Sequence, residues 1–408
     1  MKILIVTQYF FPEDFRINDF AFVLAKRGHE VTVLTGLPNY PDGKFFGSFK
    51  LFSKEMLNDV CLYRVPIFSR GKSRGWELFI NYISFLISSL IFGPFLLRRK
   101  EFDVVFAVNF SPATVGVCGA FFAAFKKAKF GVWVQDLWPD SLKATSAISS
   151  TLILDIVGIM VKWIYSRADT IFVQSTGFIE SIKNMGISPH KIEYFPNWAE
   201  DFYGTNDPQL KNVYNKYIPK NKFIIMFAGN LGVAQSLNTI IQAAIILKNE
   251  PIHWIILGAG RAEAGFKSNI SKHGLESNIS LIGKFPVNLM PNFFSLADVM
   301  LVTLKDDPAF SSTIPSKIQS YLKSGKPILS ALNGDGGAVI NNSGAGINVS
   351  AEDYKELAFA ALSLSKLSSE DLFDMGAKGK CFYDNNFDIS VLVARFEAWA
   401  NTTHDDLS

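Results

Sequence analysis

The stretch that most constrains the fold of this chain runs from Phe223 to Ala244, with the sequence FIIMFAGNLGVAQSLNTIIQAA. It starts with an unbroken apolar run of strand length, and from Leu237 onwards its apolar residues repeat with helical spacing. A glycine-containing loop, Gly229 to Gly232, separates the two. Such a unit is an ordinary turn in many proteins. The same loop also lets backbone N–H groups and a helix N-terminus approach a phosphate.

The alternation of apolar strands and helices continues along the whole chain. KILIVTQYF, HEVTVLTG, DVVFAVNF and TIFVQST come before this stretch, and HWIILGAG, ISLIGKF, DVMLVTL and KPILSAL follow it. Buried strands joined through helices form parallel sheets. A chain of 408 residues also favours two domains over one. We therefore predict an α/β chain of two doubly wound domains, residues 1–200 and 201–387, with the polar segment 206–222 as the linker.

Composition excludes several classes of protein. The three cysteines and five histidines are scattered, so neither a disulfide framework nor a metal site is indicated, and a reducing cytosol fits best. The first residues run straight into a strand, without the order of regions typical of a signal peptide. Pro12, Glu13 and Asp14 follow the first strand where a nicotinamide-binding domain needs its glycines. No nucleic-acid-binding motif is present.

The segment from Leu78 to Leu97 has 20 residues and no charge. Its length allows a transmembrane helix, but polar residues and a Gly-Pro pair interrupt it, and a strand of the same sheet follows at once. A helix buried in the domain and a helix lying in the membrane interface are the alternatives. The basic run Arg98-Arg99-Lys100 and the charge split, 22 − 16 = +6 for residues 1–196 and 18 − 21 = −3 for the rest, favour the interface.

Several motifs in order resemble the family 4 retaining glycosyltransferases. They are the opening KILIVTQYFFPEDFRINDFAFVLAKRGHEVTVLTGLPNYP, FPNWAE at 195–200, AGNLGVAQ at 228–235, GAGR at 258–261 and PSKIQSYLKSGKPIL at 315–329. The branch that they resemble transfers fucosyl and N-acetyl-L-fucosaminyl groups in bacterial O-antigen and capsule assembly. The resemblance implies the GT-B fold, in which two Rossmann-like domains face each other across a cleft and the last helix, here 388–401, returns to the first domain.

The resemblance also implies a donor site in the second domain and an acceptor site in the first. Expected donor-binding residues are Gly229, Asn230, Leu231, Gly232, Gln235, Gly258, Gly260, Arg261, Lys284, Phe285, Ser316 and Ser320. Ser316 and Lys317 are expected to begin and N-cap a helix, and Lys317 is the candidate cation for the donor diphosphate. On the acceptor side we expect Glu13, Arg16, Asn109 and Gln135, with Asp136 as the candidate that contacts the reacting groups.

Some positions depart from the family pattern. Asn230 and Gln235 stand where an Arg and a Lys are usual, and Ser312 and Ser320 replace two glutamates. Gln135 replaces a histidine. Serine binds sugar hydroxyls more weakly than a carboxylate does, so a catalytically weak homologue that acts as an assembly partner stays an alternative. A nucleotide-sugar epimerase is another.

The resulting expectation is a retaining hexosyltransferase that needs no metal or cofactor besides its UDP-sugar donor. No Asp-x-Asp motif follows a strand, and the adjacent pair Asp306-Asp307 lacks that spacing. The expected acceptor is a polyprenyl-diphosphate-linked sugar, and the expected location is peripheral on the cytoplasmic face of the membrane. The particular sugar and linkage do not follow from spacing, because specificity depends on a few hydroxyl contacts.

Overall fold

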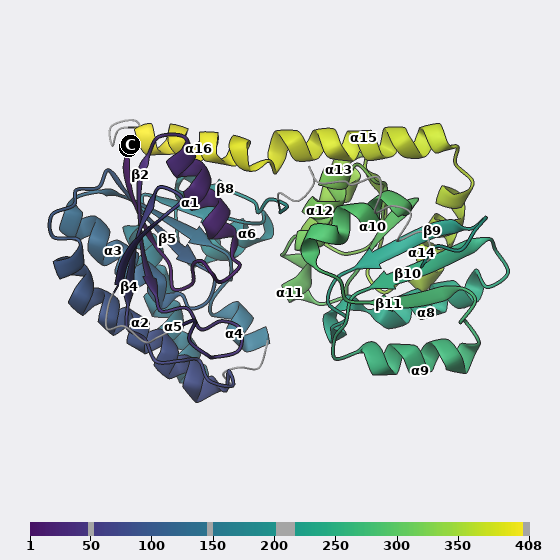
Figure 1. The fold of residues 1–408 in the computed structure, drawn as a ribbon, viewed down its shortest axis with the longest axis horizontal. Helices are drawn as coiled ribbons and strands as arrows, with labels where there is room; N and C mark the ends of the chain where they lie inside the picture. The colour runs from purple at the N-terminus through teal and green to yellow at the C-terminus, as the bar shows by residue number, and fades with distance from the viewer. Residues whose placement is uncertain (48–52, 145–149, 201–216, 403–408) are drawn as a thin grey trace. The chain divides into compact units, whose positions relative to one another are not determined.

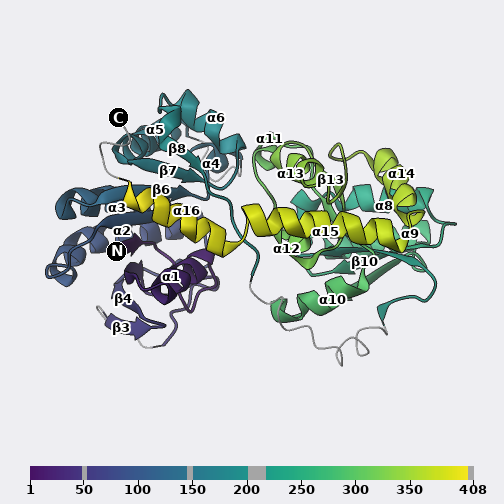
Figure 2. The same ribbon diagram turned by 90° about the horizontal axis from the view of Figure 1, so that it is seen from above.

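The structure, a computed structural model, describes residues 1–47, 53–144, 150–200 and 217–402. The chain divides into two compact units, Met1–Pro196 with Ile389–Ser408, and Asn197–Asp388. The expected linker 206–222 lies mostly outside the described residues. The chain crosses from the second unit back to the first between α15 (Ser369–Asn386) and α16 (Ile389–Asn401), drawn in yellow in Figures 1 and 2.

Within the described residues the first unit contains an eight-stranded sheet in the order β3-β4-β2-β1-β5-β6-β7-β8. The strands are β1 (Lys2–Val6), β2 (Glu30–Gly36), β3 (Ser53–Leu57), β4 (Val60–Val65), β5 (Val104–Asn109), β6 (Lys129–Val134), β7 (Thr170–Val173) and β8 (Ile192–Tyr194). The pairs are parallel, as predicted, except at β3, which pairs antiparallel with β4. The sequence did not reveal β3, because its central residues are exposed and lack an apolar run.

Two helical layers cover this sheet. One contains α2 (Gly75–Leu96), α3 (Thr114–Lys126), α5 (Thr151–Arg167) and α6 (Gly177–Asn184), with α4 (Asp140–Ala144) nearby (Figure 1). The other contains α1 (Arg16–Lys26) and α16, which pack through aromatic rings such as Phe20 and Phe396, 5.1 Å apart. The Lys129 ammonium donates to the carbonyl oxygens of Trp399 and Thr402, which fastens the end of α16 to the sheet.

Helix α2 packs along one face only. The Asn81 side chain of α2 accepts a hydrogen bond from Gln8 at 2.6 Å. A Cβ added at Gly93 would stand 2.3 Å from the ring of Phe122, so the backbone of α2 packs directly against this ring. By length and composition the helix is apolar enough to cross a membrane, yet only 22% of its most apolar window is buried in the protein. A helix tied to its own sheet in this way differs both from a free spanning helix and from a fully buried one.

The second unit contains a six-stranded parallel sheet within the described part of the chain, in the order β11-β10-β9-β12-β13-β14. The strands are β9 (Phe223–Ala228), β10 (Ile252–Leu257), β11 (Ile279–Gly283), β12 (Val299–Thr303), β13 (Ile328–Ala331) and β14 (Gly346–Val349). Numbered along the chain, this is the order 3-2-1-4-5-6 of a Rossmann fold. The direction of winding reverses between β9 and β12, and ligands of open α/β sheets bind at that switch point.

Helices cover both faces of the second sheet. The core on one face contains side chains of α8 (Leu237–Ile246), α9 (Glu263–His273) and α14 (Tyr354–Ser365). The other face carries α10 (Met290–Leu296), α12 (Ser316–Ser324), α13 (Asp335–Ser343) and α15, with the short α11 (Pro308–Ser311) beyond them (Figure 2). The apolar residues that repeat with helical spacing in α8 are buried, namely Leu237, Ile240, Ile241 and Ala244.

Candidate active site

A cavity of about 790 Å³ lies at the carboxyl ends of the strands of the second unit. This volume is typical of a small-molecule site, roughly 300–1,000 Å³. The loops after β9, β10 and β11 line it together with the start of α12. Among its lining residues are ten expected from the sequence, namely Gly229, Asn230, Gln235, Gly258, Gly260, Lys284, Phe285, Ser316, Lys317 and Ser320.

Two glycine loops form one wall of the cavity. Gly229 and Gly258 have φ values of +147° and +141°, which L side chains rarely adopt. A Cβ on Gly258 would stand 1.8 Å from the carbonyl oxygen of Gly229, and one on Gly260 would stand 2.4 Å from that of Leu231. The two loops therefore need glycine in order to approach each other, and this close approach keeps their backbones at the cavity.

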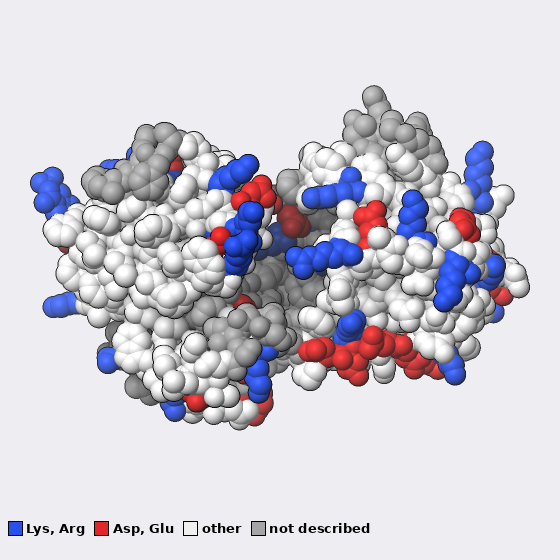
Figure 3. All heavy atoms as spheres, turned by 90° about the horizontal axis from the view of Figure 1, so that it is seen from below, with Lys and Arg blue, Asp and Glu red and all other residues white. Residues whose placement is uncertain are grey.

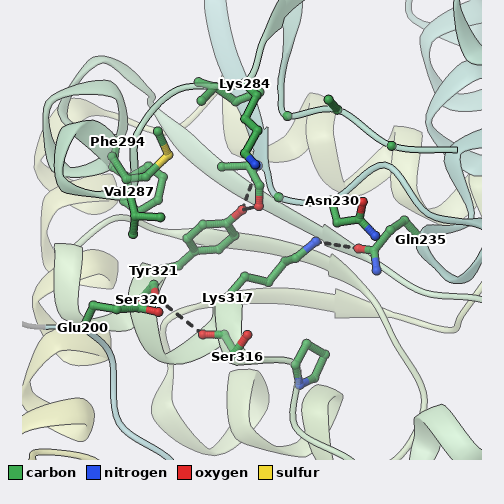
Figure 4. Close-up of a pocket in the computed structure, with 18 of the residues that line it drawn as sticks. Glu200, Asn230, Gln235, Lys284, Val287, Phe294, Ser316, Lys317, Ser320 and Tyr321 are labelled. Carbon is green, nitrogen blue, oxygen red and sulfur yellow. Dashed lines mark hydrogen bonds between the residues drawn. The ribbon is translucent and has the colours of Figure 1, made fainter. Parts of the chain in front are cut away.

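The side chain of Lys317 lies at the centre of the cavity (Figure 4). Its ammonium donates to Oε1 of Gln235 and stands 3.9 Å from the centroid of the Phe227 ring. No carboxylate lies within ion-pair distance of it among the described residues. Burial lowers the pKa of Lys317 to about 7, from the usual 10.5. The cavity thus holds a cation that lacks a counter-charge.

The two ends of the cavity differ in polarity. Asn230 and Gln235 lie at one end beside Lys317, whereas Val287 and Phe294 lie at the other (Figure 4). Lys284 extends into the cavity from the loop after β11, and the apolar lining residues Phe285, Met290 and Pro291 are close to it in the chain. One end is therefore suited to an anionic group and the other to a flat apolar group.

A carboxylate to which the motifs assigned no role lies at this cavity. The Ser320 hydroxyl approaches Oε2 of Glu200 at 3.4 Å, and Glu200 lines the cavity. The Lys323 ammonium, one turn along α12, donates to the Glu200 backbone carbonyl oxygen at 3.2 Å. Glu200 ends the motif FPNWAE, so the motif itself was the signal that could have identified it. It supplies a carboxylate beside one of the serines that replace the family glutamates.

Three residues expected on the donor side do not line this cavity. Leu231 is fully buried in the core, where its backbone N–H donates to the Ala259 carbonyl oxygen at 2.9 Å. Gly232 precedes the 3₁₀ turn Val233–Gln235, and Arg261 is exposed and is not a lining residue. Ser316 is the first residue of α12 and not its N-cap, which is Pro315 without a side-chain capping bond. The predicted capping role of Ser316 is therefore wrong.

In the first unit, Glu13 and Asn109 lie inside the fold. Glu13 is 3% exposed, and its carboxylate accepts backbone N–H groups from Phe10, Asn39 and Tyr40 at 2.7–3.2 Å. Burial raises its pKa despite these bonds. Asn109 is 3% exposed and stands so close to α3 that a Cβ on Gly116 would be 3.2 Å from its Nδ2. Because both side chains are buried to this extent, direct contact of Glu13 or Asn109 with an acceptor does not fit the structure.

The other acceptor-side residues surround the carboxyl ends of β1, β5 and β6. Arg16 begins α1 and is half-buried, and Gln135 follows β6, where its carbonyl oxygen accepts from Gln174 at 3.1 Å. Asp136 is half-buried, with Oδ2 accepting from the Ser111 hydroxyl at 3.0 Å and from Nε1 of Trp138 at 3.2 Å. These bonds hold the Asp136 carboxylate at this edge, where it stays partly accessible to a ligand hydroxyl.

Comparison with known families accounts for both units. Residues 16–198 match the family described as "Glycosyl transferase 4-like domain", and residues 211–380 match "Glycosyl transferases group 1". The chain belongs to the family 4 glycosyltransferases. It is 25% identical over 340 residues to WcaI of Escherichia coli K12, whose name places it in colanic acid biosynthesis, with 80% of this chain and 82% of that protein covered. WbjE of Pseudomonas aeruginosa, named as a glycosyltransferase, is 25% identical over 288 residues, covering 66% and 67%.

Solved structures give the same fold at low identity. Sucrose-phosphate synthase from Thermosynechococcus elongatus matches with a TM-score of 0.72 and 12% identity, over 98% of both chains. Anabaena Alr3699/HepE in complex with UDP matches with a TM-score of 0.71 and 12% identity, over 98% of this chain and 99% of that one. The glycosyltransferase WaaG matches with a TM-score of 0.63 and 14% identity, over 99% and 100%. The GT-B fold expected from the motifs is therefore confirmed, and the family matches identify the protein as a glycosyltransferase.

The contact between the glycine loops gives a prediction about stability. We expect Gly258→Ala to lower the free energy of unfolding by about 2–4 kcal/mol, because the added Cβ would meet the Gly229 backbone and the positive φ would be strained. Urea unfolding would measure this. Gly265→Ala is the matched control, because this helical glycine has open space around it and alanine favours the helix by about 0.5–1 kcal/mol. Equal unfolding midpoints for the two variants would contradict the prediction.

Proposed function

We propose that this glycosyltransferase transfers a sugar from UDP, with retention of configuration, to a polyprenyl-diphosphate-linked sugar in surface-polysaccharide synthesis. The observation that carries the proposal is Lys317, a cation without a counter-charge at the switch point of the second sheet. Breaking the bond between the sugar and the β-phosphate leaves negative charge on that phosphate. A positioned ammonium in a partly water-excluded site stabilises this charge strongly.

The rest of the cavity fits the remaining parts of the donor. The apolar end with Phe285 and Val287 suits the uracil base, and Lys284 can add a second positive charge at the diphosphate. The Glu200 carboxylate and Ser320 hydroxyl suit ribose or sugar hydroxyls. N-acetyl-L-fucosamine or a related amino-deoxy sugar is the proposed transferred group, on the basis of the motif resemblance. Asp136 of the first unit is the proposed contact for the acceptor hydroxyl.

The surface of the first unit supports attachment to a membrane. Large apolar side chains are exposed along α2, α3 and α5: Trp76, Phe79, Ile80, Ile87, Ile91, Phe95, Phe121, Phe125, Leu152, Ile153, Ile156, Ile159 and Trp163. Figure 3 shows a broad uncharged area on the first unit, with basic and some acidic side chains around it. An exposed apolar face of this extent indicates a membrane or partner surface. We propose that it rests on the cytoplasmic leaflet.

In the basic run Arg98-Arg99-Lys100, one of the three cations is less available to lipids than the sequence suggests. The side chains of Arg98 and Arg99 are exposed, but the Lys100 ammonium pairs with Glu30 at 2.9 Å. Only the two arginines are therefore fully available to anionic lipids. Each contributes about 1 kcal/mol near such a surface.

A donor screen tests the proposed activity. The purified protein is incubated with UDP-, GDP- and dTDP-sugars and a polyprenyl-diphosphate-linked sugar, and the products are identified by mass. We expect a product one sugar heavier with a UDP-sugar. A product with GDP- or dTDP-sugars alone would contradict the choice of nucleotide. Binding of UDP without transfer or hydrolysis of any donor would instead support a catalytically weak assembly partner.

We also expect transfer to continue in excess EDTA. In the proposed site the charge on the leaving diphosphate is balanced by Lys317 and Lys284, so no divalent cation is required for that purpose. The measurement is the initial rate with and without chelator, with added Mg²⁺ or Mn²⁺ as the control. Complete loss of the rate in EDTA, followed by recovery with either ion, would contradict the lysine-based site.

A further inference from the structure

A cluster of aromatic rings lies at the switch point of the first sheet. Winding reverses there between β1 and β5, as it does at the cavity of the second unit. The ring of Phe15 stands 5.0 Å from Tyr9, 5.1 Å from Tyr40 and 5.0 Å from Phe110, measured between centroids. These rings come from the loops after β1, β2 and β5. Three separate loops thus build one aromatic surface where a ligand of such a sheet is expected.

Arg70 adds a positive charge to this surface. Its guanidinium lies 4.6 Å from the centroid of Tyr40 and 5.9 Å from that of Tyr9. Its Nε donates to the Ser73 hydroxyl at 3.1 Å, and its terminal nitrogens form no hydrogen bond or ion pair with any described residue. By contrast, Arg27 and Arg64 of the same unit form ion pairs with glutamates at 2.8 and 2.9 Å. A stacked, unpaired guanidinium is well suited to bind a phosphate through two hydrogen bonds.

The loops that carry these groups are held in place from within. The Asn39 side chain accepts the backbone N–H of Arg70 at 2.9 Å, and the Glu13 carboxylate accepts the N–H groups of Asn39 and Tyr40. Asn39 and Glu13 are both buried. Glu13 therefore positions the loop that carries Tyr40. Its role on the acceptor side is to support this surface and not to contact the acceptor. Such preorganisation reduces the entropy lost when a ligand binds.

Tyr82 links the cation to the candidate reactive carboxylate. It lies in α2, its ring is 6.4 Å from that of Trp138, and Trp138 donates to Asp136. Burial raises the pKa of the Tyr82 phenol, and the charges of Arg70 and Asp136 both act on it with opposite sign. The phenol is therefore near both groups.

We propose that Arg70, held by the rings of Tyr9 and Tyr40, binds the diphosphate of an isoprenoid-linked acceptor through its guanidinium. Phe68 and Trp76, 68% and 62% exposed, flank Arg70 in the chain, and Trp76 begins the exposed apolar side of α2. The isoprenoid tail leaves along this side, and the sugar next to the diphosphate lies toward Asp136. The proposal rests on the proposed function, because it names the site that holds that acceptor.

Calorimetric titration with farnesyl diphosphate tests the site. Excess UDP is present throughout, so that the cavity beside Lys317 is filled and cannot bind the diphosphate of the probe. If UDP does not bind, the titration is repeated in the Lys317→Met background, in which this cavity lacks its lysine. We expect Arg70→Gln to weaken binding of farnesyl diphosphate by about 10- to 100-fold, as loss of a charge-assisted pair does. Lys72→Gln is the matched control, an exposed cation two residues away, and we expect less than a threefold effect.

Inorganic pyrophosphate and farnesol identify what is recognised. We expect both to bind at least tenfold more weakly than farnesyl diphosphate. Equal affinity for pyrophosphate would show a free-diphosphate site and would overturn the lipid part of the proposal. Unchanged binding by Arg70→Gln would assign the stacking a structural role only. Arg70→Lys, which keeps the charge but loses the planar fork, should bind with intermediate affinity and guards against a folding defect in the glutamine variant.

Titration with UDP separates this proposal from the proposed function. UDP should bind wild type and Arg70→Gln with equal affinity, since the donor cavity lies in the other unit. If UDP fails to bind wild type while farnesyl diphosphate binds through Arg70, the donor assignment fails and the acceptor site stands. If UDP binds and Arg70 has no effect on farnesyl diphosphate, only the acceptor site fails.

Discussion

Replacing Lys317 with methionine is expected to slow sugar transfer by about 100-fold or more and, at the same time, to raise the melting temperature. The rate falls because one group that stabilises the developing phosphate charge is lost, an effect commonly of this size. Stability rises because methionine fills the site without the cost of holding an ammonium between Phe227 and Gln235. Initial rates with the donor found in the screen and melting curves by calorimetry measure the two effects.

The gain in stability should depend on pH in a definite direction. The pKa of Lys317 is about 7 in the folded protein and near 10.5 in the unfolded chain, so the unfolded chain binds more protons between these values. Wild type therefore becomes more stable as pH rises from 7 to 10.5. The advantage of Lys317→Met should be largest below pH 7 and should shrink above it. Melting curves at pH 6.5 and 9.5 would show this trend.

A bound diphosphate should reverse the shift, because its negative charge favours the protonated amine. The affinity for a UDP-sugar, whose diphosphate has no proton to lose near neutral pH, should fall as pH rises above 7. Lys366→Met, an exposed lysine of the same unit, is the control and should change neither rate nor stability appreciably. A fully active Lys317→Met variant, or one with a lower melting temperature, would rule out the role assigned to this lysine.

Replacing both Ile156 and Ile159 on α5 with serine is expected to weaken liposome binding by about 100-fold. These side chains are 57% and 71% exposed, and each would lose roughly 1.5 kcal/mol of transfer free energy into the lipid. Together the loss is about 3 kcal/mol, or two powers of ten. Co-sedimentation with liposomes of graded anionic lipid content gives the partition coefficient. Folding should be unaffected, since neither side chain contributes to the core.

Phe373→Ser is the matched control for this measurement. Phe373 is 72% exposed, but it lies on α15 in the second unit, so its loss should leave liposome binding unchanged. High salt should weaken binding only in part, because it screens Arg98 and Arg99 but not the apolar contact. If the α5 variant and wild type bind equally at every lipid composition, the apolar face serves another partner.

The sequence alone determined the alternation of strands and helices and the position of the donor loops. Unbroken apolar runs such as FIIMFA need burial on both faces, and the glycine turns after them have few local alternatives. Ten residues predicted for the donor side line one cavity, because the carboxyl ends of parallel strands meet at one edge of the sheet. The antiparallel edge strand β3 was missed because an exposed strand carries no such apolar signal.

Contacts between distant parts of the chain were decided only by the tertiary structure. Glu200 reaches Ser320 across 120 residues, and Arg70 meets Tyr9 and Tyr40 from separate loops. The burial of Glu13 and Asn109 likewise depends on residues distant in the sequence, which no local pattern predicts. The apolar side chains of α5 that pack inward and those that face outward are of the same residue types. Only the tertiary structure therefore shows which residues of this helix are exposed. Local sequence encodes the elements, whereas burial and the pairing of charges are properties of the assembled fold.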